Sequence, residues 1–119
     1  MTATPACIAI YLLALALHAL ALAAGLAVLA RFGDAFRASR PAHFRTPTEW
    51  RYATVAFSTL GNIFLLGALA LYIARYVGDL PAWLELVFAL GHLFGAFCAV
   101  VWHGLTYAEM REGRACGRG

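Results

Sequence analysis

The sequence predicts an all-α fold, a bundle of three transmembrane helices, and three observations support this prediction. Of the 119 residues, 63% are hydrophobic and 13% are charged, and the mean hydropathy of +0.75 lies far from that of a soluble domain. Three apolar runs each reach the roughly 20 residues that a helix needs to cross a bilayer. Basic residues gather between and after these runs. We therefore expect residues 1–119 to form a single integral membrane domain.

The three runs predict helices at about residues 7–30, 47–75 and 81–108. The sequence TPTE that opens the second run has the pattern of a capping box with proline at the first helical position, which favours a helix start there. The short segment between the second and third runs predicts an antiparallel hairpin. Residues 31–46 are expected to form a cytoplasmic connection, and residues 109–119 a basic cytoplasmic tail.

The basic residues predict how the chain is oriented. All nine are arginine: five lie in or beside the connection at 31–46, three lie in the tail, and only Arg75 borders the second connection. Because cytoplasmic loops are enriched in Lys and Arg, we expect the N-terminus outside and the C-terminus in the cytoplasm. Arginine without lysine, together with abundant alanine, is typical of a GC-rich bacterial genome, so the expected location is the bacterial inner membrane.

Three polar side chains, His18, Asn62 and His92, carry the main functional signal. Each lies about ten residues into its own apolar run, which at about 1.5 Å per residue places all three near the bilayer midplane. A polar side chain at this depth is costly when it faces lipid and needs a hydrogen-bond partner, a ligand or water. We expect each one to face the bundle interior or a partner.

Two interpretations of these residues stay open. In the first, they join the helices to one another, or to a neighbouring subunit, through hydrogen bonds worth about 0.6 kcal/mol each. In the second, His18 and His92 are cofactor-binding residues, either as both axial ligands of a b-type haem or singly on the magnesium of a (bacterio)chlorophyll. The three cysteines never form a C-x-x-C pair, so no separate metal site is predicted.

Two further polar residues of the third run have ordinary explanations. His103 lies beside Trp102 near the expected cytoplasmic surface, where an imidazole can snorkel to headgroups or water. Glu85 lies near the outer end, where we expect an ion pair with Arg75; the alternative is a contact with a proton path or a quinone headgroup.

Small residues share a helix face with the buried polar ones. Such faces let helices, or a flat cofactor, approach closely. On the first helix the face holds Ala14, His18, Ala21 and Gly25, on the second Ser58, Thr59 and Asn62 before it continues as leucine, and on the third Glu85, His92, Gly95, Ala96, Ala99 and His103.

The sequence shows no set of nucleophile, base and orienting residue and no phosphate-binding glycine loop, so we do not expect an enzyme. Three helices are too few to enclose a sizeable cavity, which favours packing against something larger. We expect a non-catalytic accessory subunit of a larger membrane-protein complex in respiratory or photosynthetic electron transport, in contact with lipid and quinone. The net charge of +3 needs no nucleic acid to explain it.

Two other functions remain open at this point. One is a b-type haem or (bacterio)chlorophyll-binding subunit that uses His18 and His92. The other is a small self-assembling pore, because three helices with an outer N-terminus and a basic inner tail resemble the topology of phage holins.

Overall fold

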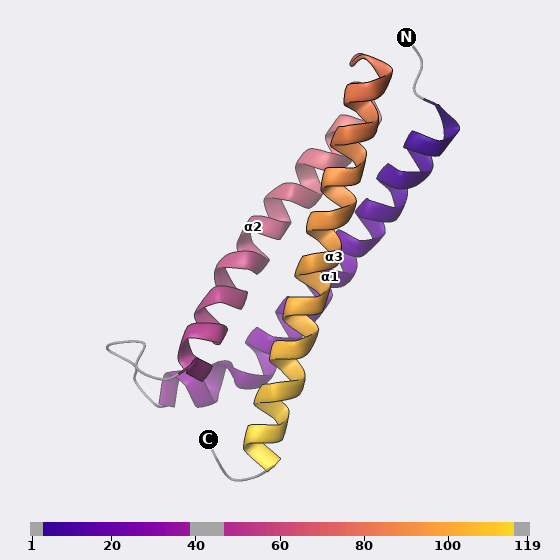
Figure 1. The fold of residues 1–119 in the computed structure, drawn as a ribbon. Helices are drawn as coiled ribbons and strands as arrows, with labels where there is room; N and C mark the ends of the chain where they lie inside the picture. Colours follow the sequence, from indigo (N-terminus) through magenta and orange to yellow (C-terminus); the bar gives the residue numbers. More distant parts are fainter. Residues whose placement is uncertain (1–3, 39–46, 116–119) are drawn as a thin grey trace.

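The computed structural model describes residues 4–38 and 47–115, with side chains described over 4–34 and 50–112. It contains three helices, α1 (Pro5–Ala38), α2 (Pro47–Arg75) and α3 (Ala82–Ala115), and no strand in these described ranges (Figure 1). Each helix includes a segment of 26 to 31 residues that is long and apolar enough to cross a bilayer. The all-α prediction and the number of spans are confirmed, and the chain is a multi-pass membrane protein.

Two helices run further than the apolar runs predicted. α1 continues to Ala38 rather than ending near residue 30, and α3 continues to Ala115 rather than residue 108. Hydropathy marks where a span leaves the apolar layer, whereas the helix itself continues through good helix formers such as alanine, arginine and glutamate. The first part of the expected connection and of the tail is therefore helical. Residues 39–46 of that connection and 116–119 of the tail lie outside the described residues.

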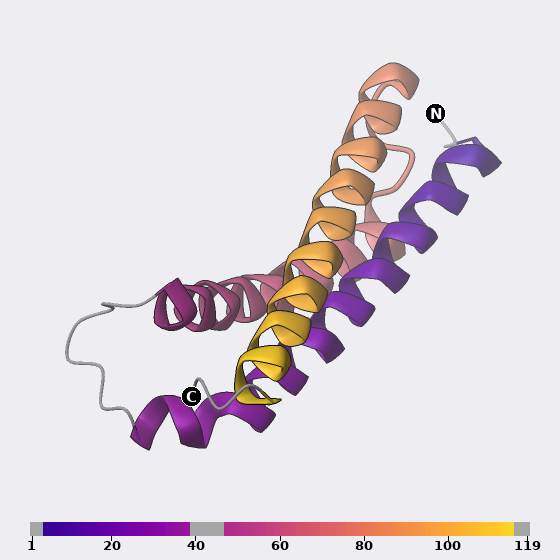
Figure 2. The same ribbon diagram turned by 60° about the horizontal axis from the view of Figure 1, so that its bottom comes forward.

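α1 is the helix on which the other two pack. It contacts α3 and α2 extensively, whereas α2 and α3 contact each other only sparsely. α1 and α3 run in the same direction, and α2 is antiparallel to both (Figure 1). Figure 2 shows α2 diverging from α3 towards the end where α2 begins. The bundle is therefore open on the side between α2 and α3.

The buried positions of α1 from Cys7 to Phe32 follow a regular spacing of three and four residues, and those of α3 fit the same pattern with two steps of seven. This is the heptad spacing of helices that pack with a slight left-handed supercoil. The predicted small-residue face of α1 is confirmed, because its members are all buried, whereas His92 and Ala99 of the α3 face are half-buried and Gly95 is exposed. The buried residues are Cys7, Tyr11, Ala14, His18, Ala21, Gly25, Val28, Phe32 and Gly33 on α1, and Glu85, Ala89, Ala96, His103, Thr106 and Met110 on α3.

A carboxylate cluster closes the end of the bundle that holds the start of α1 and the loop between α2 and α3. Oε1 of Glu85 accepts hydrogen bonds from the hydroxyls of Tyr11 and Tyr72, each at 2.5 Å, and Oε2 accepts one from the backbone N of Gly78 at 3.1 Å. Gly78 has a φ of 98°, a left-handed conformation that suits glycine and turns the loop back over α3.

The ion pair expected between Glu85 and Arg75 is therefore replaced by a buried cluster. Glu85 is only 1% exposed, whereas Arg75 is exposed. The short loop returns the chain so tightly that two tyrosine hydroxyls and a backbone amide reach the carboxylate, and a carboxylate can be buried when several donors satisfy it.

Arginine side chains pack on aromatic rings at the opposite end of the bundle. Arg51, at the start of α2, forms an ion pair with Glu109 and lies 5.2 Å from the ring centroid of Trp102, both on α3. Arg31 of α1 lies 5.8 Å from the ring centroid of Tyr107. These contacts tie the helices together where the arginine-rich segments begin.

The close approach at Gly25 gives a prediction about packing. A Cβ at this position would collide with Oγ1 of Thr59 and would lie 3.1 Å from the ring of His103. We expect Gly25→Ala to lower the free energy of unfolding in detergent by about 1–3 kcal/mol, because overpacking forces helices apart. Gly67→Ala is the matched control, since nothing lies within 4 Å of a Cβ there. Equal stability of the two variants would contradict the packing described.

Candidate functional site

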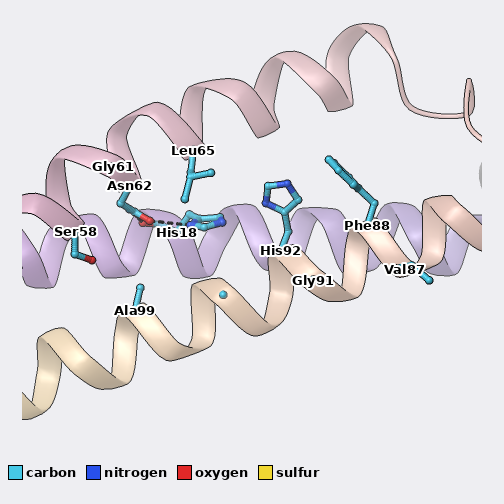
Figure 3. A pocket seen from close by; sticks show the side chains of 11 residues that line it. His18, Ser58, Gly61, Asn62, Leu65, Val87, Phe88, Gly91, His92 and Ala99 are labelled. Carbon is cyan, nitrogen blue, oxygen red and sulfur yellow. Dashed lines mark hydrogen bonds between the residues drawn. The ribbon is translucent and has the colours of Figure 1, made fainter.

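His18 and Asn62 form a two-bond clasp between α1 and α2 near the middle of their spans. Nδ1 of His18 lies 2.7 Å from Oδ1 of Asn62, and Nδ2 of Asn62 donates to the backbone carbonyl of His18 at 2.6 Å (Figure 3). The two residues are 2% and 3% exposed. The predicted interhelical hydrogen bonding of this pair is confirmed.

The clasp also fixes which nitrogen of His18 carries the proton. A carbonyl oxygen can only accept, so the Asn62 amide must direct its NH₂ group at the His18 carbonyl and its Oδ1 at the imidazole. Oδ1 in turn can only accept, so Nδ1 of His18 must be the donor. In the neutral imidazole Nε2 then carries no proton and presents a lone pair.

His103 has the same arrangement one layer further along the bundle. Its Nδ1 lies 2.7 Å from the backbone carbonyl of Ala21 and must donate, so Nε2 accepts the hydroxyl proton of Ser58 at 2.8 Å. His103 is fully buried, so the expectation that it snorkels to the surface is wrong. The physical reason is Gly25, which has no side chain and leaves space for the ring against α1.

The difference between the two histidines lies at Nε2. In His103 that nitrogen is capped by Ser58, whereas Nε2 of His18 is buried and has no hydrogen-bond partner among the described residues. Leaving a buried acceptor without a partner costs about 1–3 kcal/mol. A buried acceptor of this kind calls for a partner from outside the chain, either a ligand or an ordered water.

A groove of about 620 Å³ runs between α2 and α3, with His18 of α1 in its lining. In Figure 3, one nitrogen of the His18 ring is bonded to Asn62 and the other points away from it towards His92. Three other buried atoms lack a partner among the described residues, on Thr59, Trp102 and Thr106, but these residues do not line the groove. It is lined by His18, Ser58, Gly61, Asn62, Leu65, Val87, Phe88, Gly91, His92, Gly95 and Ala99.

Glycines make the groove wide. Nothing lies within 4 Å of a Cβ built at Gly61, Gly91 or Gly95, so these positions are open rather than packed. The side chains at the rim, among them Leu65 and Phe88, are 46% and 43% exposed on the surface that faces the bilayer. A molecule dissolved in the membrane can therefore enter from the side.

The structure brings His18 and His92 together, as the sequence suggested, but in direct contact. Their ring centroids lie 5.8 Å apart in an edge-to-face arrangement, and His92 also contacts Phe88 at 5.0 Å. Two axial ligands of one haem must stand on opposite sides of the macrocycle. The neighbouring contact between α1 and α3, through the fully buried Ala14 and Ala89, leaves no slot for a macrocycle between the two rings.

The described residues hold no further metal-binding arrangement. No group of three or more His, Cys, Asp and Glu side chains that could hold a metal ion occurs among them. Cys7 is buried and Cys98 exposed, and both are free thiols. The site thus consists of two imidazoles, an amide and a hydroxyl around an apolar groove.

Together the fold and the site define a class: a small multi-pass membrane protein with an open, mainly apolar groove between two helices and a buried histidine in its lining. Comparisons with protein-family models, with curated proteins and with solved structures find no match. The chemistry of the groove itself is therefore the basis for interpreting the function.

The groove and the role of Ser58 were not predicted from the sequence. The pair Gly91 and Gly95, four residues apart on α3, was a usable signal because small residues at this spacing mark a face of a membrane helix that another group can approach closely. The bond from Ser58 to His103 had no comparable signal, since it depends on how α2 is rotated relative to α3.

The clasp yields a quantitative prediction. In a double-mutant cycle of His18→Ala and Asn62→Ala, we expect a coupling free energy of about 1 kcal/mol, because two interhelical bonds are lost together. The cycle of His18→Ala with Thr54→Ala is the control; Thr54 is exposed and bonds to the Trp50 carbonyl on its own helix, so additive effects are expected. Unfolding in mixed detergent micelles measures both. Additivity in the first cycle would rule out the clasp.

Proposed function

We propose that this protein is a non-catalytic accessory subunit of a larger membrane complex in electron transport, and that its groove between α2 and α3 binds a membrane-soluble molecule. The observation that supports this most strongly is the buried Nε2 of His18, which has no hydrogen-bond partner among the described residues, on a side chain that lines an open groove. A buried acceptor in the membrane is costly unless something satisfies it. The distribution of arginine supports an orientation with the C-terminus in the cytoplasm of a bacterium.

An accessory role is supported by how the polar groups are used. Glu85 is satisfied by three donors and His103 by two partners, so these residues hold the bundle together. His18 and His92 are the described imidazoles that line the groove. Neither is paired with an acid or a nucleophile in the way that acid–base or covalent catalysis requires.

The outer faces of α2 and α3 support assembly with a partner. Large aromatic side chains project from them, with Phe57 75%, Phe64 71% and Phe94 70% exposed. Lipid alone can cover such residues, but rigid aromatic rings are also the side chains that most often anchor protein interfaces. The two helices contact α1 on one side and are free for contacts on the other.

A tetrapyrrole site is the second candidate. A histidine whose Nδ1 donates to an oxygen while Nε2 stays free has the arrangement typical of metal-ligating histidines, and His18 has it. Such a group would supply electron transfer or light absorption. Because His92 lies in the direction in which Nε2 of His18 points, a macrocycle centred over that nitrogen requires His92 to move. This candidate therefore ranks below the first.

A self-assembling pore stays a prediction with less support. A pore needs polar side chains on a shared outer surface, to line a channel between copies. The polar residues His18, Asn62 and His103 are instead buried inside the bundle.

Isolation from the native membrane tests the first function against the second. After solubilisation in mild detergent, we expect the chain to elute in a stoichiometric complex with redox subunits, and to lose this association when Phe64 and Phe94 are both changed to Leu. Leu20→Ala, at an exposed position of α1, is the control substitution. Elution as an isolated chain would contradict the accessory role. Haem or chlorophyll absorption bands at one chromophore per isolated chain would favour the second candidate instead.

A further inference from the structure

We infer that the groove binds the head group of a quinol, with one quinol hydroxyl donating a hydrogen bond to Nε2 of His18. This inference rests on the proposed function and names the ligand of that site. It is supported by the hydrogen-bond inventory of the groove, by its shape and volume, and by the position of His92.

The groove offers fixed acceptors. In the neutral ring, Nε2 of His18 has no proton because Nδ1 carries it. The Ser58 hydroxyl, which also lines the groove, gives its proton to His103 and so presents lone pairs. The amide of Asn62 is engaged at both ends by His18. A ligand that satisfies Nε2 of His18 must therefore be a donor.

Few membrane-soluble molecules carry a donor to the middle of a bilayer. Acyl chains have none, and the lining of the groove is mainly apolar. A quinol combines an apolar ring and tail with two hydroxyl donors. The oxidised quinone has carbonyl oxygens in their place, which can only accept, so it would leave Nε2 of His18 unsatisfied. The site should therefore distinguish the reduced from the oxidised form.

The volume of the groove suits a ring better than a protein helix. The lining of α3 extends from Val87 to Ala99, a rise of about 18 Å, and a helix about 10 Å in diameter would displace roughly 1,400 Å³ over that length. The groove holds about 620 Å³, within the range of about 300–1,000 Å³ that small-molecule sites occupy. Gly91 and Gly95 provide a flat wall, and Phe88 offers an aromatic ring at the rim.

The position of His92 favours an approach by the edge of a ring. A tetrapyrrole metal lies at the centre of a wide plate, which would collide with His92 as it reaches Nε2 of His18. A phenolic hydroxyl stands at the edge of a single ring and can enter from the groove with a small rotation of the His92 side chain. His92 is half-buried and contacts the neighbouring rings of His18 and Phe88 without a hydrogen bond to another described residue, so its ring is not held in place by a polar partner.

Binding of a decyl-substituted benzoquinol to the purified chain in lipid nanodiscs tests the inference. Isothermal titration under anaerobic conditions compares the quinol with the corresponding quinone. We expect the quinol to bind about tenfold more tightly, as one additional hydrogen bond to a buried acceptor implies. Equal affinity for the two forms would overturn the proposal.

Three variants locate the site. Gly91→Leu fills the groove and should abolish binding, whereas Gly104→Leu, on the same helix and equally open, lies outside the groove and should bind as wild type. His18→Phe keeps the ring but removes the acceptor, so the tenfold preference for the quinol should disappear while the helical content stays unchanged. Unaltered binding by Gly91→Leu, or an unaltered preference in His18→Phe, would contradict the assignment.

The ligand and the proposed function can fail separately. If quinol does not bind but the chain still elutes with a redox complex, the ligand is wrong and the accessory function stands. If haemin instead binds at one per chain and the His18→Phe variant no longer binds it, the quinol proposal is overturned in favour of a tetrapyrrole. Preferential quinol binding by a chain that joins no complex would support the site and contradict the accessory function.

Discussion

The structure depends on one constraint, which is that a polar group inside a bilayer must find its partner within the protein or in a ligand. His18 and Asn62 meet this constraint through two reciprocal bonds, and those bonds have three consequences for the molecule. They join α1 to α2, they settle the tautomer of the neutral His18 ring, and they turn its Nε2 away from Asn62 towards His92. The same constraint explains why Glu85 collects three donors at one end of the bundle.

The role of α1 as the shared packing surface accounts for the groove. Its buried face alternates small residues with larger ones at heptad spacing, so α2 and α3 can both approach it. Because the contacts of α2 and α3 are made mainly with α1 and not with each other, the surface between them stays open at Gly61, Gly91 and Gly95. A bundle too small to enclose a cavity thus obtains a binding groove from a gap between two helices, with a side chain of the third as its floor.

Much of the fold, but less of the site, could be predicted from the sequence. Hydropathy was sufficient to predict three spans. The position of each residue within its apolar run was sufficient to predict that His18, Asn62 and His92 lie at the same depth in the bilayer. The roles of Glu85 and His103 were predicted wrongly, because each depends on distant groups, Tyr11 and the Gly78 amide in one case and the Ala21 carbonyl in the other. Helix rotation and the path of a loop decide such contacts, and neither is encoded in the periodicity of a single helix. The membrane orientation predicted from arginine stays a prediction.

The protonation of the His18 ring decides whether the groove offers an acceptor, and nitrogen-15 NMR of the histidine ring nitrogens in lipid bilayers measures it. The signals of His18 are assigned by their loss in His18→Phe. We expect a protonated Nδ1 and an unprotonated Nε2 for His18. When Asn62 is changed to Leu, we expect the proton to be shared between the two ring nitrogens. A proton on Nε2 of His18 in the wild-type protein would contradict the tautomer, and with it the acceptor on which the binding proposal depends.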